Sequence, residues 1–409
     1  MFSDTAAKKG VTFPKGFKAA GVKAGIKKSG NLDVAVIYSE EEAAVAGVFT
    51  QNAVAAAPVY VSKAAVEDGK ARAIVANAGC ANACTGEQGM EDAKRTADIA
   101  AEALGCAAGD VIVASTGVIG VNLPMEKLEK GIKDAAASLS DTGSVDAGNA
   151  IITTDTHSKA CAAEVEIGGK KVRFGAIAKG SGMIQPNMAT MLGFVATDAG
   201  IAQPLLDALV KEAADESFNC ITIDGDTSTN DSFILIASGR SGVDFTAADA
   251  AGYAELRAAV IGVARELAQA IVRDGEGATK FITVAVKSGR DREECKTVGY
   301  AVAHSPLVKT AFFASDPNLG RILAAIGYAG IDSLDVDKVR VWLSSMGEET
   351  LVAEKGGRAA SYCEEDGARI MQSAEITVRI DLGRGQACGV VYTSDLSYEY
   401  VKINADYRS

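Results

Sequence analysis

The chain has 409 residues, 48% of them hydrophobic and 23% charged, which is ordinary for a soluble globular protein and long enough for two or more domains around a large core. A formal net charge of −12, without a basic stripe, argues against nucleic acid as a partner. The N-terminus lacks the apolar core of a signal peptide and no apolar run approaches membrane-spanning length, so we expect a cytoplasmic protein with no membrane partner.

Strand and helix patterns alternate in the first part of the chain. Short β-rich runs at 33–38 and 45–50 predict two neighbouring strands, and 71–76 predicts a third, followed by a Gly- and Asn-rich loop and a helix over about 89–104. Residues 111–114 predict a strand that leads into Thr116-Gly117, before a helix that Pro124 opens. Backbone N–H groups at such a turn could hold an oxyanion, and a plain β–α turn that uses Gly for backbone reasons is an equal alternative.

The later part of the chain continues the mixed pattern and ends in what we expect to be a smaller C-terminal α/β lobe over about 289–395. A hairpin is expected at 165–174, with Gly168-Gly169 at its turn. Further predicted helices begin at Pro204 and span about 247–273 and 298–311. Further predicted strands are 231–238, 281–286, 339–344, 374–382 and 389–393.

The stretch from Lys179 to Asp198 joins a constrained loop, rich in Gly and Pro, to an apolar run that predicts a buried strand. Thr190 lies at the junction, where a hydroxyl is either a nucleophile or merely the first residue of a strand. The chain has two histidines and no G-x-S-x-G motif, so the sequence gives little support for a Ser-His-Asp triad. A threonine whose own α-amine is the base needs no histidine, provided that the bond between Ala189 and Thr190 is cut.

No metal or resident cofactor is expected. The eight cysteines are scattered, and the C-x-x-x-C pair Cys80 and Cys84 has no second pair or His cluster to complete a zinc site, so free buried or half-buried thiols are predicted. The acidic loop 224–231 resembles a calcium loop only superficially, because Leu235 stands where an EF-hand needs Glu. Dinucleotide and ATP signatures are missing from the sequence.

Long motifs run through nearly the whole chain: Pro14-Lys-Gly-Phe-Lys-Ala-Ala-Gly21, Asn77-Ala-Gly-Cys-Ala-Asn-Ala-Cys-Thr-Gly86, Ser115-Thr-Gly-Val-Ile-Gly120, Asp316-Pro-Asn-Leu-Gly-Arg321 and Tyr400-Val-Lys-Ile-Asn-Ala-Asp-Tyr-Arg-Ser409. With Ala189-Thr190-Met191-Leu192, they closely resemble the ornithine acetyltransferase (glutamate N-acetyltransferase) family of arginine biosynthesis, whose members cleave themselves before this threonine.

This resemblance implies a role for particular residues. Thr190 corresponds to the nucleophile, and the hydroxyl of Thr116 and the backbone N–H of Gly117 correspond to the oxyanion hole. The residues that match substrate contacts are Thr153, Lys179, Thr190, Glu276, Asn404 and Ser409. Lys179 and Thr153 suit a substrate carboxylate, and Glu276 with the C-terminal carboxylate of Ser409 suits the side-chain ammonium of ornithine.

The resemblance also implies transfer of acetyl from N-acetylornithine to glutamate through an acetyl-threonine. The residues are compatible with a monofunctional enzyme and with a bifunctional one that also takes acetyl-CoA as a donor. The expected fold is a layered α/β/β/α sandwich, built jointly by segments 1–189 and 190–409, in a heterotetramer of two alpha and two beta chains. The alternatives are a self-cleaving, aminopeptidase-like amidohydrolase and a non-catalytic amino-acid-binding protein.

Overall fold

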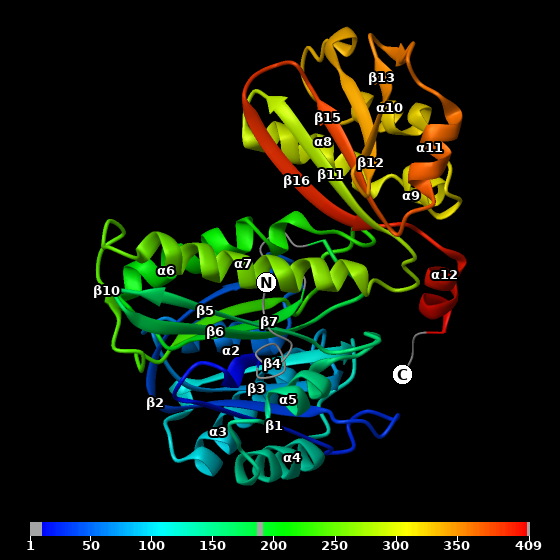
Figure 1. Cartoon of the computed structure of the whole chain (residues 1–409). Coiled ribbons are helices and arrows are strands. Elements are labelled where there is room, and N and C mark those ends of the chain that lie inside the picture. Colours follow the sequence, from blue (N-terminus) through cyan, green and yellow to red (C-terminus); the bar gives the residue numbers. More distant parts are fainter. Residues whose placement is uncertain (1–9, 186–190, 407–409) are drawn as a thin grey trace. The chain divides into compact units, whose positions relative to one another are not determined.

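The chain forms two compact units (Figure 1). The structure, a computed structural model, describes residues 10–185 and 191–406. Unit 1 holds the described residues up to Asn219 together with Thr227–Ile271, and unit 2 holds Cys220–Asp226 and the described residues from Val272 onward. The range 289–395 lies inside unit 2. Across the described parts of the chain, none of the helices is both long and apolar enough to cross a membrane.

One eight-stranded sheet, bent over on itself, organises unit 1. Its long strand β2 (Val34–Phe49) pairs with β1 (Phe17–Val22) over residues 34–39 and with β3 (Lys70–Cys80) over residues 34–38 and 43–44. The same strand pairs with β9 (Ser232–Ala237) over residues 44–49. The prediction of two separate strands at 33–38 and 45–50 is therefore wrong, because one strand carries the chain from one layer to the other. In spatial order the sheet runs β4 (Val111–Val118), β3 (Lys70–Cys80), β2 (Val34–Phe49), β9 (Ser232–Ala237), β7 (Leu192–Thr197), β6 (Lys170–Lys179) and β5 (Lys159–Ile167), with β1 (Phe17–Val22) beside β2.

The two halves of this sheet pack face to face, with helices on both outer sides (Figure 1). Alternation along β2 explains the layering: Val34 and Val36 face the helical side, while Ala35 and Ile37 face the core between the sheet halves. The expected α/β/β/α sandwich is confirmed. The helices are α3 (Gly86–Leu104) and α4 (Met125–Ala137) on one side, α6 (Gln203–Asp215) and α7 (Tyr253–Arg273) on the other, and α2 (Ala57–Ala65) and α5 (Ser144–Ile151) against the central core.

Strands from both sides of the predicted cleavage point are direct neighbours in this sheet. β6 pairs with β7 in antiparallel register, and β9 pairs with both β2 and β7. The predicted hairpin is confirmed as β5 and β6, which are longer than expected. A short parallel pair, β8 (Gly200–Ile201) with β10 (Asp244–Phe245), completes the unit.

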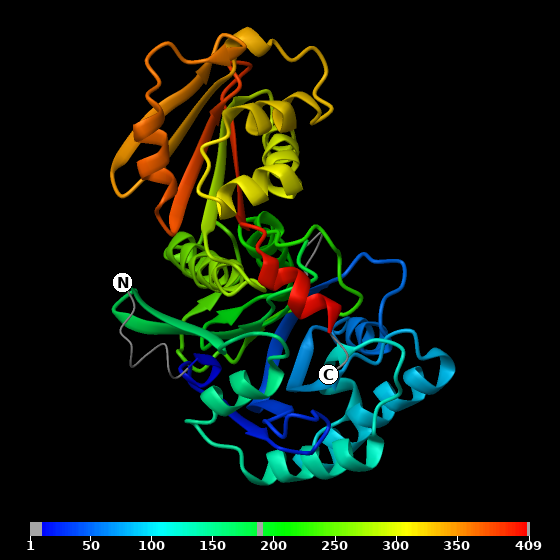
Figure 2. The ribbon, with the colours of Figure 1, turned by 90° about the vertical axis from the view of Figure 1, so that its right-hand side faces the viewer.

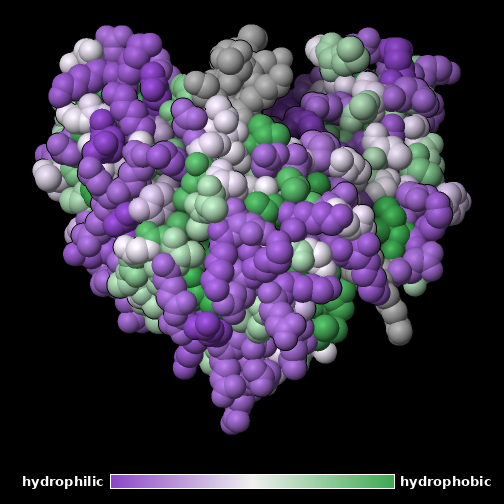
Figure 3. Space-filling view, turned by 90° about the horizontal axis from the view of Figure 1, so that it is seen from below, coloured by the Kyte–Doolittle hydropathy of each residue, from purple (hydrophilic) through white to green (hydrophobic). Residues whose placement is uncertain are grey.

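Seen from the side of α3 and α4, the surface is mainly hydrophilic (Figure 3), in keeping with the exposed charged residues of α4.

Unit 2 is a six-stranded sheet with helices packed on one face around a single apolar core. Figure 2 shows α8, α9 and α10 in yellow, gathered on the same side of the sheet. The strand order is β14 (Gly357–Arg358), β13 (Glu348–Glu354), β12 (Arg340–Ser345), β15 (Glu375–Asp381), β11 (Phe281–Gly289) and β16 (Ala387–Ser394). The helices are α8 (Arg292–His304), α9 (Pro306–Phe313), α10 (Leu319–Gly327), α11 (Glu364–Met371) and α12 (Tyr398–Ala405).

The single helix predicted over 298–311 is wrong, because the chain breaks it at Ser305. Pro306 has no N–H to donate, and the Ser305 Oγ instead accepts from the backbone N–H of Val308 at 3.3 Å as the cap of α9.

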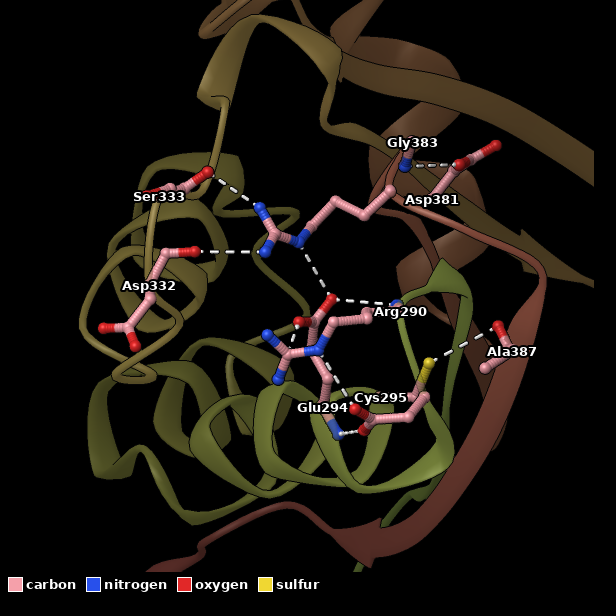
Figure 4. Close-up of polar contacts among 10 residues, drawn as sticks. Arg290, Glu294, Cys295, Asp332, Ser333, Asp381, Gly383 and Ala387 are labelled. Atoms are coloured by element: carbon pink, nitrogen blue, oxygen red, sulfur yellow. Dashed lines mark hydrogen bonds and ion pairs between the residues drawn. The ribbon is translucent and has the colours of Figure 1, made fainter.

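A buried ion pair holds the start of α8 to the loop before β16 (Figure 4). The side chain of Glu294 is 1% exposed, and its Oε1 accepts from Arg384 Nε at 2.9 Å. The same guanidinium donates to the carbonyl oxygens of Asp332 and Ser333, at 3.0 and 2.7 Å. One arginine thereby joins three segments of unit 2, and the burial of the Glu294 carboxylate makes its ion pair with Arg384 costly to lose.

Candidate active site

Thr116 and Gly117 lie inside β4, close to its end. The prediction that they form a β–α turn is wrong, because β4 continues to Val118 and α4 begins only at Met125. Gly117 has φ +127°, and a Cβ there would stand 2.4 Å from the carbonyl carbon of Gly79 on β3. Only glycine fits so close to a neighbouring backbone.

A buried polar network holds this end of β3 and β4. Asn230 Nδ2 donates to the carbonyl oxygens of Ala81 and Ser115, at 2.6 and 2.9 Å. The Ser115 hydroxyl donates to Asn77 Oδ1 at 2.7 Å, and Asn77 Nδ2 donates to the Cys80 carbonyl at 2.9 Å. These bonds fix the backbone on which Thr116 and Gly117 are placed.

Lys179, the last residue of β6, reaches the end of β4. Its ammonium donates to the Oγ1 of Thr116 at 3.1 Å. It also repels the ammonium of Lys27: burial first, and then Lys179, lowers the pKa of Lys27 to about 8, against the opposing pull of Asp33 and Asp155. A fixed positive charge beside a hydroxyl is suited to binding a carboxylate.

Thr153 follows α5 and is half-buried. Its backbone N–H donates to Asp155 Oδ2 at 3.0 Å, while Asp155 Oδ1 accepts from the backbone N–H of Gly180 at 2.7 Å. The structure therefore brings four predicted site residues of unit 1 together: Lys179 contacts Thr116 directly, Gly117 adjoins Thr116, and Thr153 is joined through Asp155 to the residue that follows Lys179.

Three predicted site residues, Ala189, Thr190 and Ser409, lie outside the described residues. Their roles remain predictions. The strand that follows is described: the Met191 carbonyl accepts from the backbone N–H of Ser232 at 2.9 Å, and Leu192 begins β7 opposite Ser232. The buried strand predicted after the junction is confirmed, since every residue of β7 is buried.

The two remaining predicted site residues, Glu276 and Asn404, belong to unit 2 and contact each other. The Nδ2 of Asn404, on α12, donates to Glu276 Oε2 at 2.7 Å. On the same helix, the Tyr400 hydroxyl donates to Asp224 Oδ2 at 3.2 Å. Burial first, and then the charge of Asp224, raises the pKa of Tyr400, so this phenol keeps its proton and donates. The carboxylates here suit an ammonium group.

Each of the two histidines has a threonine hydroxyl beside its ring. His157 is exposed, with its Nδ1 2.9 Å from the hydroxyl of Thr156. His304 is half-buried on α8, with its Nε2 3.0 Å from the hydroxyl of Thr222. The cysteines are free, as predicted, but the expectation that all are buried or half-buried is wrong, because Cys84, Cys363 and Cys388 are exposed.

Asp155 and Asn230 were given no role by the sequence, although each organises the backbone of predicted site residues. Both stand in short runs of small polar residues, Thr153-Thr-Asp-Thr156 and Thr229-Asn-Asp231, beside a helix or strand end. Such runs are typical of loops, so composition alone does not separate a residue that holds a site from one that faces solvent.

The chain is similar in sequence to proteins of a known family. A family model described as the ArgJ family matches residues 18–409. The arginine biosynthesis bifunctional protein ArgJ from Bacillus halodurans is 40% identical over 44% of this chain and 95% of its own, with a TM-score of 0.42. The ornithine acetyltransferase from Mycobacterium tuberculosis, solved in complex with ornithine, is 41% identical over 44% of this chain and 97% of its own, with a TM-score of 0.41. The resemblance stated from the motifs is confirmed, and the chain belongs to the ArgJ family of arginine-biosynthesis acyltransferases.

Proposed function

We propose that this chain cleaves itself before Thr190 and then transfers acetyl from N-acetylornithine to glutamate through an acetyl ester on that threonine. The observation that carries the proposal is the contact of the Lys179 ammonium with the Thr116 hydroxyl, beside Gly117. The Lys179 ammonium, which suits the substrate carboxylate, is thereby hydrogen-bonded to the Thr116 hydroxyl, one of the two proposed oxyanion donors. The membership of the chain in the ArgJ family supports the same proposal.

The cleavage step is an acyl shift followed by hydrolysis. The Thr190 hydroxyl attacks the carbonyl carbon of Ala189, the C–N bond breaks, and the proton passes to the released amine. Water then opens the ester, which frees the carboxylate of Ala189 and leaves Thr190 as a new N-terminus. Such an α-amine, with a pKa near 8, can serve as a general base without any histidine.

The transfer step uses the same hydroxyl twice. The α-amine takes the Thr190 proton while the oxygen attacks the acetyl carbonyl of N-acetylornithine, and the Thr116 hydroxyl and Gly117 N–H stabilise the oxyanion. The amide bond breaks, the nitrogen takes the proton, and ornithine leaves. The amine of glutamate then attacks the acetyl carbonyl, the ester C–O bond breaks, and the amine proton passes to the Thr190 oxygen. N-acetylglutamate leaves, and the Thr190 hydroxyl is regenerated in a ping-pong cycle.

The proposed substrate contacts divide by charge. Thr153 and Lys179 hold the α-carboxylate, which both substrates carry, whereas Glu276, with Asn404, holds the side-chain ammonium of ornithine. The complex of the M. tuberculosis relative with ornithine supports an amino-acid substrate of this class. Glu276→Gln should therefore raise the KM for N-acetylornithine by about tenfold and leave the KM for glutamate unchanged, since glutamate has no side-chain ammonium. Steady-state kinetics with each substrate varied in turn measures both values.

Intact mass under denaturing conditions tests the first step. The wild type should give two pieces, split before Thr190, and Thr190→Ala a single chain. An uncut wild type would remove the N-terminal amine from the mechanism and leave an amino-acid-binding protein. Native mass on the cleaved sample tests the proposed assembly of two alpha and two beta chains.

An acetyl-transfer assay with and without glutamate tests the second step. Acetyl release that needs glutamate supports the transferase, and equal release to water would indicate an amidohydrolase. Thr116→Val keeps the side-chain volume but removes the hydroxyl, and should lower kcat by about 10²–10³. Full activity in this variant would remove Thr116 from the oxyanion hole. Replacing N-acetylornithine by acetyl-CoA in the same assay separates the bifunctional enzyme from the monofunctional one.

A further inference from the structure

Asp155 and Lys159 form a completely buried ion pair in unit 1. Both side chains are 0% exposed, and Lys159 Nζ lies 2.5 Å from Asp155 Oδ1. Lysine and aspartate are almost never fully buried without such a partner, because each charge is costly to remove from water. The position of the pair therefore calls for a reason beyond stability.

Strand register explains how the pair comes to lie beside the candidate site. Lys159, the first residue of β5, pairs with Ala178, next to the last residue of β6. The segment before β5 and the segment after β6 are consequently adjacent. Thr153, one predicted carboxylate contact, lies in the first segment, and Lys179, the other, is the last residue of β6 and directly precedes the second segment.

Asp155 connects the two segments through its two oxygens. Oδ2 accepts from the backbone N–H of Thr153 at 3.0 Å, and Oδ1 accepts from the backbone N–H of Gly180 at 2.7 Å. Gly180 has φ +152°, a conformation that side chains rarely permit, and so its N–H is presented to the carboxylate by a residue chosen for that freedom. Charge-assisted bonds of this kind are about twice as strong as neutral ones.

Charge balance points the same way. Although burial opposes ionisation, the ammonium groups of Lys159 and Lys179 and the backbone N–H of Gly180 keep the pKa of Asp155 at about 2. Asp155 is thus an anion at neutral pH. Lys159 fixes its position through the ion pair, and its negative charge in turn attracts the ammonium of Lys179. The lysine that holds it, Lys159, also donates to the His157 carbonyl at 3.4 Å.

We infer that Asp155 is a positioning residue for recognition of the substrate α-carboxylate, acting through the backbones of Thr153 and Gly180. This inference rests on the proposed acetyl transfer. Asp155 does not contact substrate; it sets the spacing between the Thr153 hydroxyl and the Lys179 ammonium. A misplacement of about 1 Å in such a pair can lower the rate by roughly 10²-fold.

The test compares two acetyl donors that differ only in the α-carboxylate: N-acetylornithine and N-acetylputrescine, its decarboxylated analogue. The ratio of their kcat/KM values is measured on the same preparation, so the ratio does not depend on the fraction of folded enzyme. Asp155→Asn alone leaves the ammonium of Lys159 buried without its partner and is expected to fold poorly. The informative variant is the double substitution Asp155→Asn with Lys159→Met, which removes both charges.

In the double variant the preference for N-acetylornithine should fall by roughly tenfold or more, through a higher KM, with kcat/KM for N-acetylputrescine almost unchanged. The matched control is Asp198→Asn. Asp198 is also a buried carboxylate that accepts two backbone N–H groups, from Arg173 at 2.8 Å and Lys15 at 3.3 Å, but it contacts no predicted site residue among those that the structure describes. This control should keep the wild-type ratio.

An unchanged ratio in the double variant, with an active wild type, would overturn the role of Asp155 and leave the proposed function intact. If the ratio of the two kcat/KM values also fell in Asp198→Asn, loss of any buried carboxylate would have this effect. That result would overturn the specific role of Asp155. A wild type that transfers acetyl from neither donor would overturn the proposed function, and the inference with it.

Discussion

The close approach of β3 and β4 makes Gly117 a position that is sensitive to added volume. In Gly117→Ala the new Cβ would meet the Gly79 carbonyl carbon at 2.4 Å and the Cys80 nitrogen at 2.7 Å. Ordinary carbon–carbon contact needs about 3.5 Å, so the strand ends must separate by roughly 1 Å. Because both neighbours are backbone atoms, no side chain can turn aside to make room.

Two losses should follow from that separation. The left-handed backbone costs an alanine about 1–2 kcal/mol, and overpacking adds about 1–3 kcal/mol, so the free energy of unfolding should fall by about 3 kcal/mol in a urea titration. Displacing the Gly117 N–H and the Thr116 hydroxyl by about 1 Å should lower kcat for acetyl transfer by roughly 10²-fold in the folded enzyme.

Gly120→Ala is the matched control. Gly120 has φ +80°, also in the left-handed region, but within the described part of the chain no atom lies closer than 4 Å to the place that an alanine Cβ would take. This variant should lose only about 1–2 kcal/mol to backbone strain and keep its activity. If Gly117→Ala transferred acetyl at the rate of Gly120→Ala, the close contact would not position the oxyanion donors, and the reasoning would fail.

Three further substitutions probe the buried polar groups. Arg384→Met should lower the free energy of unfolding by about 3 kcal/mol, because it leaves Glu294 buried without its main partner. Arg369→Met breaks two exposed pairs and should cost no more than about 1 kcal/mol in the same denaturant titration. Burial lowers the pKa of His304 to about 4, so between pH 6.5 and about 4 the unfolded chain binds a proton that the folded chain does not. As pH falls through this range, the free energy of unfolding of the wild type should fall by about 2 kcal/mol more than that of His304→Gln. Parallel curves of stability against pH for the two proteins would contradict this. Asn230→Ala should cost about 2–3 kcal/mol and lower kcat, because two buried carbonyls lose their donor; a change in stability with unaltered kcat would separate this network from the site.

Periodicity and turn chemistry determined much of the fold in advance. The hairpin β5–β6, the buried strand β7 and the long helix α7 follow from local pattern, because alternation, a Gly-Gly turn and a three- and four-residue apolar repeat are properties of neighbouring residues. The motifs likewise identified the family and led to the predicted site residues. The prediction fails where one element serves two layers, as in β2, because the polar stretch inside that strand has the composition of a loop between two strands.

Only the tertiary structure decided which residues meet. Nothing local indicates that Lys179 donates to Thr116, which is 63 residues away, or that Asn230 donates to the carbonyl oxygen of Ser115, which is 115 residues away. The buried pair of Asp155 and Lys159 follows from the pairing of β5 with β6, which sets the register. Charged residues in an exposed loop and charged residues that become buried have the same sequence pattern. Burial strengthens the electrostatic interactions between them, and it exists only after the strands have paired.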